Sequence, residues 1–282
     1  MTAPTITYGH IAMHDLDSVT SFSETDTNNI AGWASDGDVI TATVTPTADA
    51  QTAQYEYDHT TTASTTTLSK ILCRFKTSVS SAGVKAGLKV TFTDASTQTI
   101  DLGFSTTWKT TATTLTLSKT IDKVALVVTA SGWTAGTFYV YFDFYLACKG
   151  VFTFPYVHGN VDVEMPINDA NLRASQRVGN ITQLLGADSV PIMVTGEMDA
   201  ETDWKGTNNI IGEIFYDIAQ NAYTEAFQWF TSDVVSCKVR PVNIHLSQMG
   251  GTNAQRVYTV SLREYRKRCG SNENYYERFG LI

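Results

Sequence analysis

Few residues of the chain have types and spacings suited to catalysis. Five histidines are scattered along it: His10, His14, His59, His158 and His245. The sequence contains no HExxH, GxSxG or P-loop motif, which are common signatures of metal, nucleophilic and phosphate chemistry. His10 and His14 are spaced four residues apart, but Gly9 beside them favours a strand or loop in which both are exposed. We therefore predict that the protein is not an enzyme.

Acidic and neutral residues alternate from Glu197 to Asp203, superficially like a calcium-binding loop. Trp204 occupies the position at which such a loop needs glycine, and no glutamate follows at the required distance. We interpret the segment as a solvated acidic loop.

Saccharide binding requires an exposed aromatic ring for the face of the sugar and polar groups for its hydroxyls. Trp133 is the best candidate, because it lies in the small-residue loop 131–136, where a large ring has little core to enter. Tyr55 and Tyr57 lie on one face of an expected strand and could extend the platform. The alternative is that Trp133 covers the end of its own domain.

The length and composition describe a folded chain of about two domains. The protein has 282 residues, of which 43% are hydrophobic and 17% charged, with a net charge of -8. An acidic chain lacks the excess of lysine and arginine that a dedicated nucleic-acid binder needs. Met1–Thr20 has no basic segment followed by an apolar one, and no apolar run is long enough to span a membrane.

A change in composition near residue 150 marks the expected domain boundary. Residues 1–150 contain 33 threonines and residues 151–282 contain 9. Gly150 interrupts the strand pattern and Pro155 stiffens the chain that follows. We predict domains at 1–150 and 151–282.

The first domain has the two-residue period of β-strands. Alternating runs recur at Asp38–Val44, Leu88–Thr93 and Val124–Val128. The run Thr137–Leu146 is aromatic on both faces, which favours a central strand between two packed sheets. Trp33 and Trp108 adjoin alternating residues and are expected in the core. The pattern predicts a β-sandwich.

The layout of this half resembles a known class of modules. It is carried by Gly32-Trp33, Asp36-Gly37-Asp38, Lys70–Phe75, Val90–Asp94 and Tyr141-Phe142-Asp143. Over about residues 15–150 these are similar to jelly-roll carbohydrate-binding and galactose-binding-like modules. Such modules often hold a structural calcium between their first and last strands. The resemblance implies that Asp15, Asp17 or Asp143 would bind it; no other cofactor is expected.

The second domain mixes strands with one helix. Strand-like runs occupy 161–165 and 190–197, and Asn208 can cap a helix whose apolar residues share one stripe as far as Ala222. Two long strands, Ser236–Gln248 and Arg256–Arg266, form a terminal hairpin.

Pairing residues whose numbers sum to about 506 gives this hairpin one apolar face. The pairs are Ile244 with Leu262 and Leu246 with Val260. The same register places Cys237 opposite Cys269, which allows either a disulfide or two neighbouring thiols.

The second domain also resembles a family. The run Ser189–Glu197, the single helix and the hairpin ending Tyr258–Arg266 are similar to the tube-forming β-sandwich domains of tailed-virus tail proteins. The resemblance, over about residues 155–270, implies a homo-oligomeric ring, other viral tail proteins as partners, and a place in the virion after assembly in the host cytoplasm. The domain order departs from the usual distal tail protein, which leaves tube, distal tail and baseplate open.

Two features fit a subunit interface. Long hairpin edges must be paired, covered or charged, and a neighbouring copy can pair them. The alternative is an edge guarded by basic residues: Arg256, Arg263, Arg266, Lys267 and Arg268. They could meet DNA in transit through a channel or an acidic patch on a neighbour, or simply be solvated. The C-terminal arm carries apolar residues that dock on a neighbour or fold back: Tyr275, Tyr276, Phe279, Leu281 and Ile282.

Two functions follow. The first is a structural component of a viral tail that forms a ring, with the jelly roll on the outside. The alternative is a carbohydrate-binding adhesion module, without a tube-forming role, that contacts glycans on a host surface.

Overall fold

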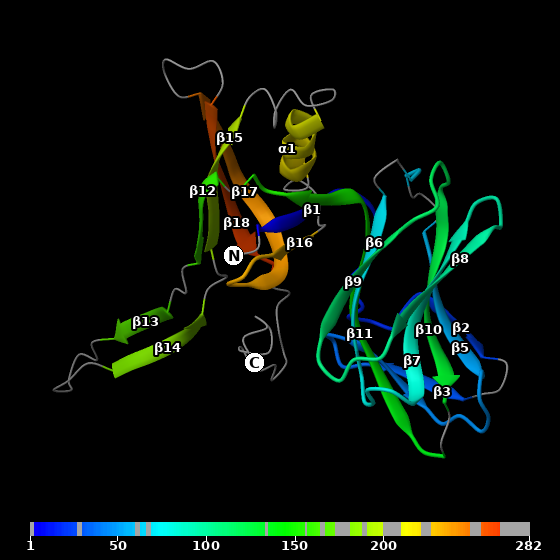
Figure 1. Cartoon of the computed structure of the whole chain (residues 1–282). Coiled ribbons are helices and arrows are strands. Elements are labelled where there is room, and N and C mark those ends of the chain that lie inside the picture. The colour runs from blue at the N-terminus through cyan, green and yellow to red at the C-terminus, as the bar shows by residue number, and fades with distance from the viewer. Residues whose placement is uncertain are drawn as a thin grey trace. The chain divides into compact units, whose positions relative to one another are not determined.

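The computed structural model describes most of the chain as antiparallel β-structure (Figure 1). It describes residues 3–26, 30–59, 63–65, 69–132, 135–155, 157–163, 167–172, 181–187, 191–199, 210–220, 227–248 and 255–265. The prediction of a mainly β protein is confirmed. The chain forms two compact units. The N-terminal unit is Gly9–Gly150, and the C-terminal unit contains Met1–Tyr8 and Val151–Arg268.

This division differs from the predicted domain 1–150 because the first eight residues belong to the C-terminal unit. Strand β1 (Thr5–His14) begins in the C-terminal unit, where Thr5 pairs with Thr231 and Ile6 with Phe230. A pairing between residues so far apart in the sequence leaves no local signal.

The N-terminal unit contains two packed sheets: sheet I, in which β1 also lies beside β11, and the five-stranded sheet II. Sheet I has the order β3-β4-β11-β6-β9, with strands Ala31–Ser35, Ile40–Val44, Phe138–Thr153, Lys70–Thr77 and Lys109–Thr114. Sheet II has the order β2-β5-β10-β7-β8, with strands Phe22–Asp26, Thr52–Asp58, Ile121–Ser131, Gly83–Phe92 and Thr97–Gly103. The predicted strands and the central position of β11, between β4 and β6, are confirmed.

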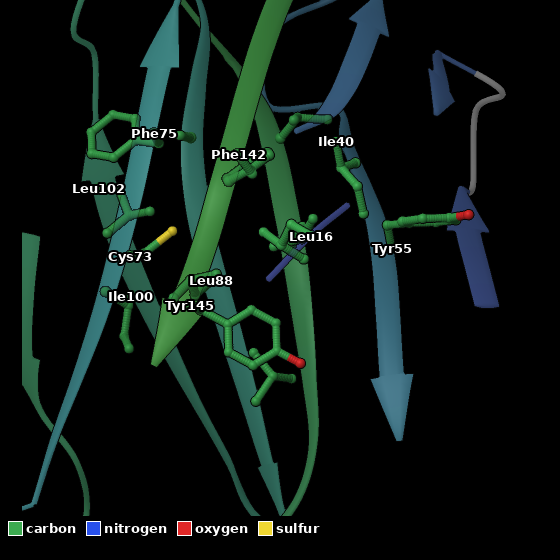
Figure 2. Packing of buried hydrophobic residues seen from close by; sticks show 14 of the residues in the cluster. Leu16, Ile40, Tyr55, Cys73, Phe75, Leu88, Ile100, Leu102, Phe142 and Tyr145 are labelled. Atoms are coloured by element: carbon green, nitrogen blue, oxygen red, sulfur yellow. The ribbon is translucent and has the colours of Figure 1, made fainter. Parts of the chain in front are cut away.

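Alternating apolar residues of both sheets form one core between them. From sheet I, Phe75 and Phe142 are fully buried, and from sheet II so is Leu126. Figure 2 shows part of this cluster, including Tyr145 and Cys73. Because Phe138, Val140 and Phe142 of β11 enter this core, the residues between them must face the other side of sheet I.

The C-terminal unit contains a sheet of order β12-β15-β18-β17-β16-β1. Its further strands are Val157–Val163, Pro191–Asp199, Gln255–Glu264, Ser236–Gln248 and Gln228–Thr231. Strands β13 (Ile167–Leu172) and β14 (Ile181–Ala187) pair separately. Glu197 and Asp199 belong to β15, so the solvated loop expected there is wrong for these two residues; Glu201 and Asp203 lie outside the described residues.

Helix α1 (Ile210–Gln220) confirms the predicted apolar stripe, because Ile214, Phe215 and Ile218 are buried. The ring of Phe215 lies 5.9 Å from that of Tyr258. Tyr258 donates a hydrogen bond of 2.5 Å to the carbonyl of Pro155 and passes over Gly196, where an added Cβ would lie 2.7 Å from its Cζ. In the part of the chain that is described, no helix has the length and apolarity to cross a bilayer.

The predicted hairpin is present, but its register is wrong by two residues. Ile244 pairs with Val260 and not with Leu262, which pairs with Pro241 beyond a bulge. Proline cannot donate a hydrogen bond to a ladder, so it favours such an irregularity. The register that would place Cys237 opposite Cys269 is therefore absent in the described hairpin; Cys237 is buried opposite Phe230 of β16, and Cys269 is not described.

Candidate functional site

Two tyrosines stand on the outward face of sheet I. Phe138, Val140 and Phe142 of β11 are buried in the core, so the intervening Tyr139 and Tyr141 point away from it. Their ring centroids lie 6.4 Å apart with an interplanar angle of 24°, and Tyr139 is 41% exposed. The pair therefore presents two nearly parallel aromatic rings at the surface of the unit.

Polar residues flank these rings on both neighbouring strands. Thr43 lies opposite Tyr139 and Thr41 opposite Tyr141 on β4, and Lys76 of β6 lies opposite Tyr141 on the other side. Directly opposed residues of antiparallel strands share a face, with Cβ atoms about 5 Å apart. We call these five residues the tyrosine face.

A buried ion pair adjoins the tyrosine face. Nη1 of Arg74 lies 2.5 Å from Oδ2 of Asp143, and its guanidinium lies 4.8 Å from the ring centroid of Trp108. A bulge in β11 between Phe142 and Phe144 gives Asp143 this position. Trp108 is thus half-buried against Arg74. It lies outside the sandwich core, although the sequence predicted it to be inside.

The predicted saccharide platform is not formed as expected. Trp133 lies outside the described residues. Tyr55 is only 8% exposed, and its ring is stacked between Phe22 at 4.8 Å and Trp33 at 4.9 Å. Its hydroxyl donates to the carbonyl of Val19 at 3.0 Å. With both faces covered by rings, Tyr55 cannot stack on a sugar, and this part of the prediction is wrong.

Tyr57, the third predicted platform residue, is half-buried in an aromatic cluster. Its ring lies 4.5 Å from that of His14 and 4.8 Å from that of His59. Nδ1 of His14 accepts a hydrogen bond of 2.9 Å from the backbone N–H of Leu16. The expectation of an exposed His14 is therefore wrong, because the ring packs among other rings; His10 is exposed as expected.

This histidine cluster continues to Tyr145, whose hydroxyl lies 2.6 Å from Nε2 of His59. Burial, and then the neighbouring His14 and His10, lower the pKa of His59 from 6.5 to about 4, against a small opposing effect of Asp58. Burial also raises the pKa of Tyr145 well above its ordinary value. Both side chains are thus held neutral, which marks a structural cluster inside the sandwich.

The aspartates that the resemblance assigned to calcium do not belong to a cluster of three acidic, histidine or cysteine side chains among the described residues. Asp143 is paired with Arg74. Asp15 and Asp17 are among the described residues, and within these no group of three histidine, cysteine, aspartate or glutamate side chains could hold a metal ion. The calcium expectation for Asp15, Asp17 and Asp143 therefore stays a prediction.

The predicted interface residues are only partly described. Arg263 is exposed on β18, opposite Arg240 of β17, and Arg256 belongs to the same strand. β18 is not an edge strand, because it pairs with β15 over nine residues as well as with β17. The remaining predicted residues lie outside the described part: Arg266, Lys267, Arg268, Tyr275, Tyr276, Phe279, Leu281 and Ile282.

Sequence reasoning missed the tyrosine face, although its signal was present. The buried positions at the start of β11 are occupied by Phe138, Val140 and Phe142, and the positions between them by Tyr139 and Tyr141. Tyrosine differs from phenylalanine by a hydroxyl that prefers water or a hydrogen bond. The separation of tyrosines from the other residues therefore indicates that one face of the strand is exposed to solvent. The prediction that both faces are packed passed over that difference.

No family model matches the chain, and no curated protein matches it. Its structure is similar to several solved carbohydrate-binding modules. A family 61 module in complex with β-1,4-galactotriose has a TM-score of 0.32 and 10% identity, covering 49% of this chain and 92% of that one. A mutant family 29 module complexed with cellulohexaose has a TM-score of 0.34 and 10% identity, covering 53% and 94%. The family 11 module from Clostridium thermocellum, in complex with a β-1,3-1,4-mixed-linked tetrasaccharide, has a TM-score of 0.33 and 14% identity, covering 52% and 96%. At TM-scores below 0.5, these likenesses carry no inference about what the chain binds.

Proposed function

We propose that the N-terminal unit binds a saccharide on the tyrosine face. The observation that carries the proposal is the pair of nearly parallel rings of Tyr139 and Tyr141 on the outward side of sheet I. An aromatic ring offers an apolar surface to the C–H face of a sugar and, in tyrosine, a hydroxyl at its edge. Two rings 6.4 Å apart give a surface for more than one sugar residue.

The neighbours of the rings supply the polar contacts that a sugar requires. Thr41 and Thr43 can each donate and accept through a hydroxyl, and Lys76 can donate through its ammonium. These side chains stand on regular strands, which hold a binding surface more firmly than loops do. The tyrosine face can thus recognise a saccharide by stacking and by hydrogen bonds together.

Alanine variants of the two tyrosines test the proposal. A glycan array selects a ligand for the intact protein, and calorimetric titration then compares it with Tyr139→Ala and Tyr141→Ala. We expect each variant to weaken binding about tenfold, which corresponds to ~1.4 kcal/mol. The matched control is Tyr216→Ala, which removes a 63% exposed ring from α1. Equal affinities for all four proteins, or binding lost by the control alone, would contradict the proposal.

A second candidate is assembly of the chain into a homo-oligomer through β17. Strand β16 covers β17 only over Ser236–Val239, and beyond this no strand in the described part of the chain pairs with that edge. Val242 is 61% exposed there and Leu246 is 36% exposed. Unpaired strand edges are templates for another chain. Such an assembly would fit the viral tail component that the sequence resembles, and the virion location stays a prediction.

Solution mass over a range of concentrations tests this second candidate. We expect a species larger than 30.9 kDa that Val242→Lys dissociates, because a buried interface does not accept an unpaired charge. Val234→Lys, in the 49% exposed turn before β17, is the control and should leave the mass unchanged. A monomer at every concentration would exclude self-assembly.

A further inference from the structure

The two sheets of the N-terminal unit carry opposite charges. The five strands of sheet I contain five lysine or arginine residues and one acid, namely Lys70, Arg74, Lys76, Lys109 and Lys149 against Asp143. The five strands of sheet II contain three lysines and six acids, namely Lys85, Lys89 and Lys123 against Glu24, Asp26, Glu56, Asp58, Asp101 and Asp122. In a protein with a net charge of -8, the strands of sheet I therefore carry a net positive charge.

On the outward side of β6, two of the three cations are engaged within the unit. Arg74 is paired with Asp143, and Nζ of Lys70 donates a hydrogen bond of 2.6 Å to the hydroxyl of Thr114. Lys76 forms no ion pair or hydrogen bond with the described residues, and it lies directly opposite Tyr141. β3 and β4 bring no acid to this face.

We propose that the tyrosine face selects an acidic saccharide. One sugar ring stacks on Tyr141. A carboxylate or sulfate group on that sugar, or on the next sugar of the saccharide, pairs with the ammonium of Lys76. This inference rests on the proposed saccharide-binding function and adds the class of ligand. A lysine on a four-carbon stem is a mobile point charge, so it can meet an anionic group at either end of Tyr141.

The local charge supports the same ligand. Lys76 is half-buried, and an ion pair beside low-dielectric protein is screened less by salt than one in open water. A neutral saccharide would leave this ammonium with water alone. An acidic saccharide would gain a charge-assisted hydrogen bond, which is about twice as strong as a neutral one.

Matched saccharides separate charge from shape. The probes are hexasaccharides of galacturonate and of mannuronate, each beside its carboxyl-reduced form of equal length and linkage, and a sulfated hexasaccharide beside its desulfated form. They are titrated into the full chain, into Lys76→Gln and into Lys109→Gln. Glutamine keeps a long polar side chain and removes the charge. Lys109 is exposed on β9 opposite the core residue Phe75, and it does not belong to the tyrosine face. The variant Lys109→Gln therefore controls for the loss of a lysine charge elsewhere on sheet I.

We expect the intact protein and Lys109→Gln to bind at least one acidic probe about tenfold or more tightly than its neutral form. Lys76→Gln should bind both forms with the affinity of the neutral one. A preference confined to the carboxylates or to the sulfate names the anionic group. Equal binding of acidic and neutral forms by the intact protein would overturn the inference and leave the proposed function intact. Binding of no saccharide, on these probes and on the array, would overturn both.

Discussion

At the scale of single residues, His59 makes stability depend on pH. Its pKa is about 4 in the folded chain and 6.5 in the unfolded one, because the folded site is buried and adjoins His14 and His10. Among the described residues, the charge of Asp58 opposes the shift. Below pH 6.5 the unfolded chain therefore binds more protons than the folded one. The contribution of His59 to stability is complete above pH 6.5 and declines as the pH falls towards 4.

We expect His59→Gln to flatten this pH dependence. The loss in the intact protein between pH 6.5 and 4 should be on the order of 2 kcal/mol for the N-terminal unit. Calorimetric unfolding at several pH values measures it, with His245→Gln, an exposed histidine of β17, as the control. A decline of equal slope in His59→Gln would show that other groups cause it.

Residue types predicted strands better than they predicted the exposure of single aromatic rings. The alternation of β5 correctly placed Tyr55 and Tyr57 on a strand, and the sequence suggested one shared exposed face. The exposure of a ring depends on what packs against it, and Trp33 and Phe22 come from other strands. Such contacts between distant segments carry no periodicity that a single sequence could display.

At the scale of elements, the bulge of β11 holds the Arg74–Asp143 pair beside the tyrosine face. We expect Asp143→Ala to destabilise the N-terminal unit by roughly 3 kcal/mol, because it leaves a guanidinium buried without its anion. The double variant Arg74→Met with Asp143→Leu should recover most of the loss. Calorimetric unfolding of the unit measures both variants.

The surface pair of Lys85 with Asp101 is the matched control. Asp101→Ala should cost less than ~1 kcal/mol, since exposed ion pairs contribute little. A cost for Asp143→Ala as small as this would show that Arg74 does not depend on Asp143.

The hairpin of β17 and β18 shows what an element's pattern can and cannot fix. Alternation predicted its two strands and its apolar face, and Tyr258, Val260 and Leu262 are buried. A shift of two residues leaves every side chain on the same face, so alternation does not distinguish such registers. The register depends on the connection between the strands and on the bulge beyond Pro241, which regular pairing does not foresee.

At the scale of the whole molecule, the first residues of the chain complete the C-terminal unit. Ile6 and Tyr8 are buried in the cluster that contains Phe230, and the backbone N–H of Trp229 donates to Oγ1 of Thr7 at 2.8 Å. A chain that begins at Gly9 therefore lacks part of that core. We expect its C-terminal unit to melt at least ~10 °C lower or not to fold, while the N-terminal unit keeps its own transition.

Scanning calorimetry of the intact and shortened chains tests this division, and Ile6→Ala is a milder variant that should move the same transition. A shift of the N-terminal transition alone would contradict the assignment of residues 1–8. The sequence placed the boundary near 150 from composition, but composition could not show that a distant segment joins the second unit.

Backbone amide shifts of the isotope-labelled protein locate a bound saccharide directly. The ligand is titrated in, and the amides that move are assigned. We predict that the shifts gather on three adjacent strands of sheet I, at Thr41, Thr43, Lys76, Tyr139 and Tyr141. Shifts confined to the loop 131–136 around Trp133, or to the C-terminal unit, would contradict it.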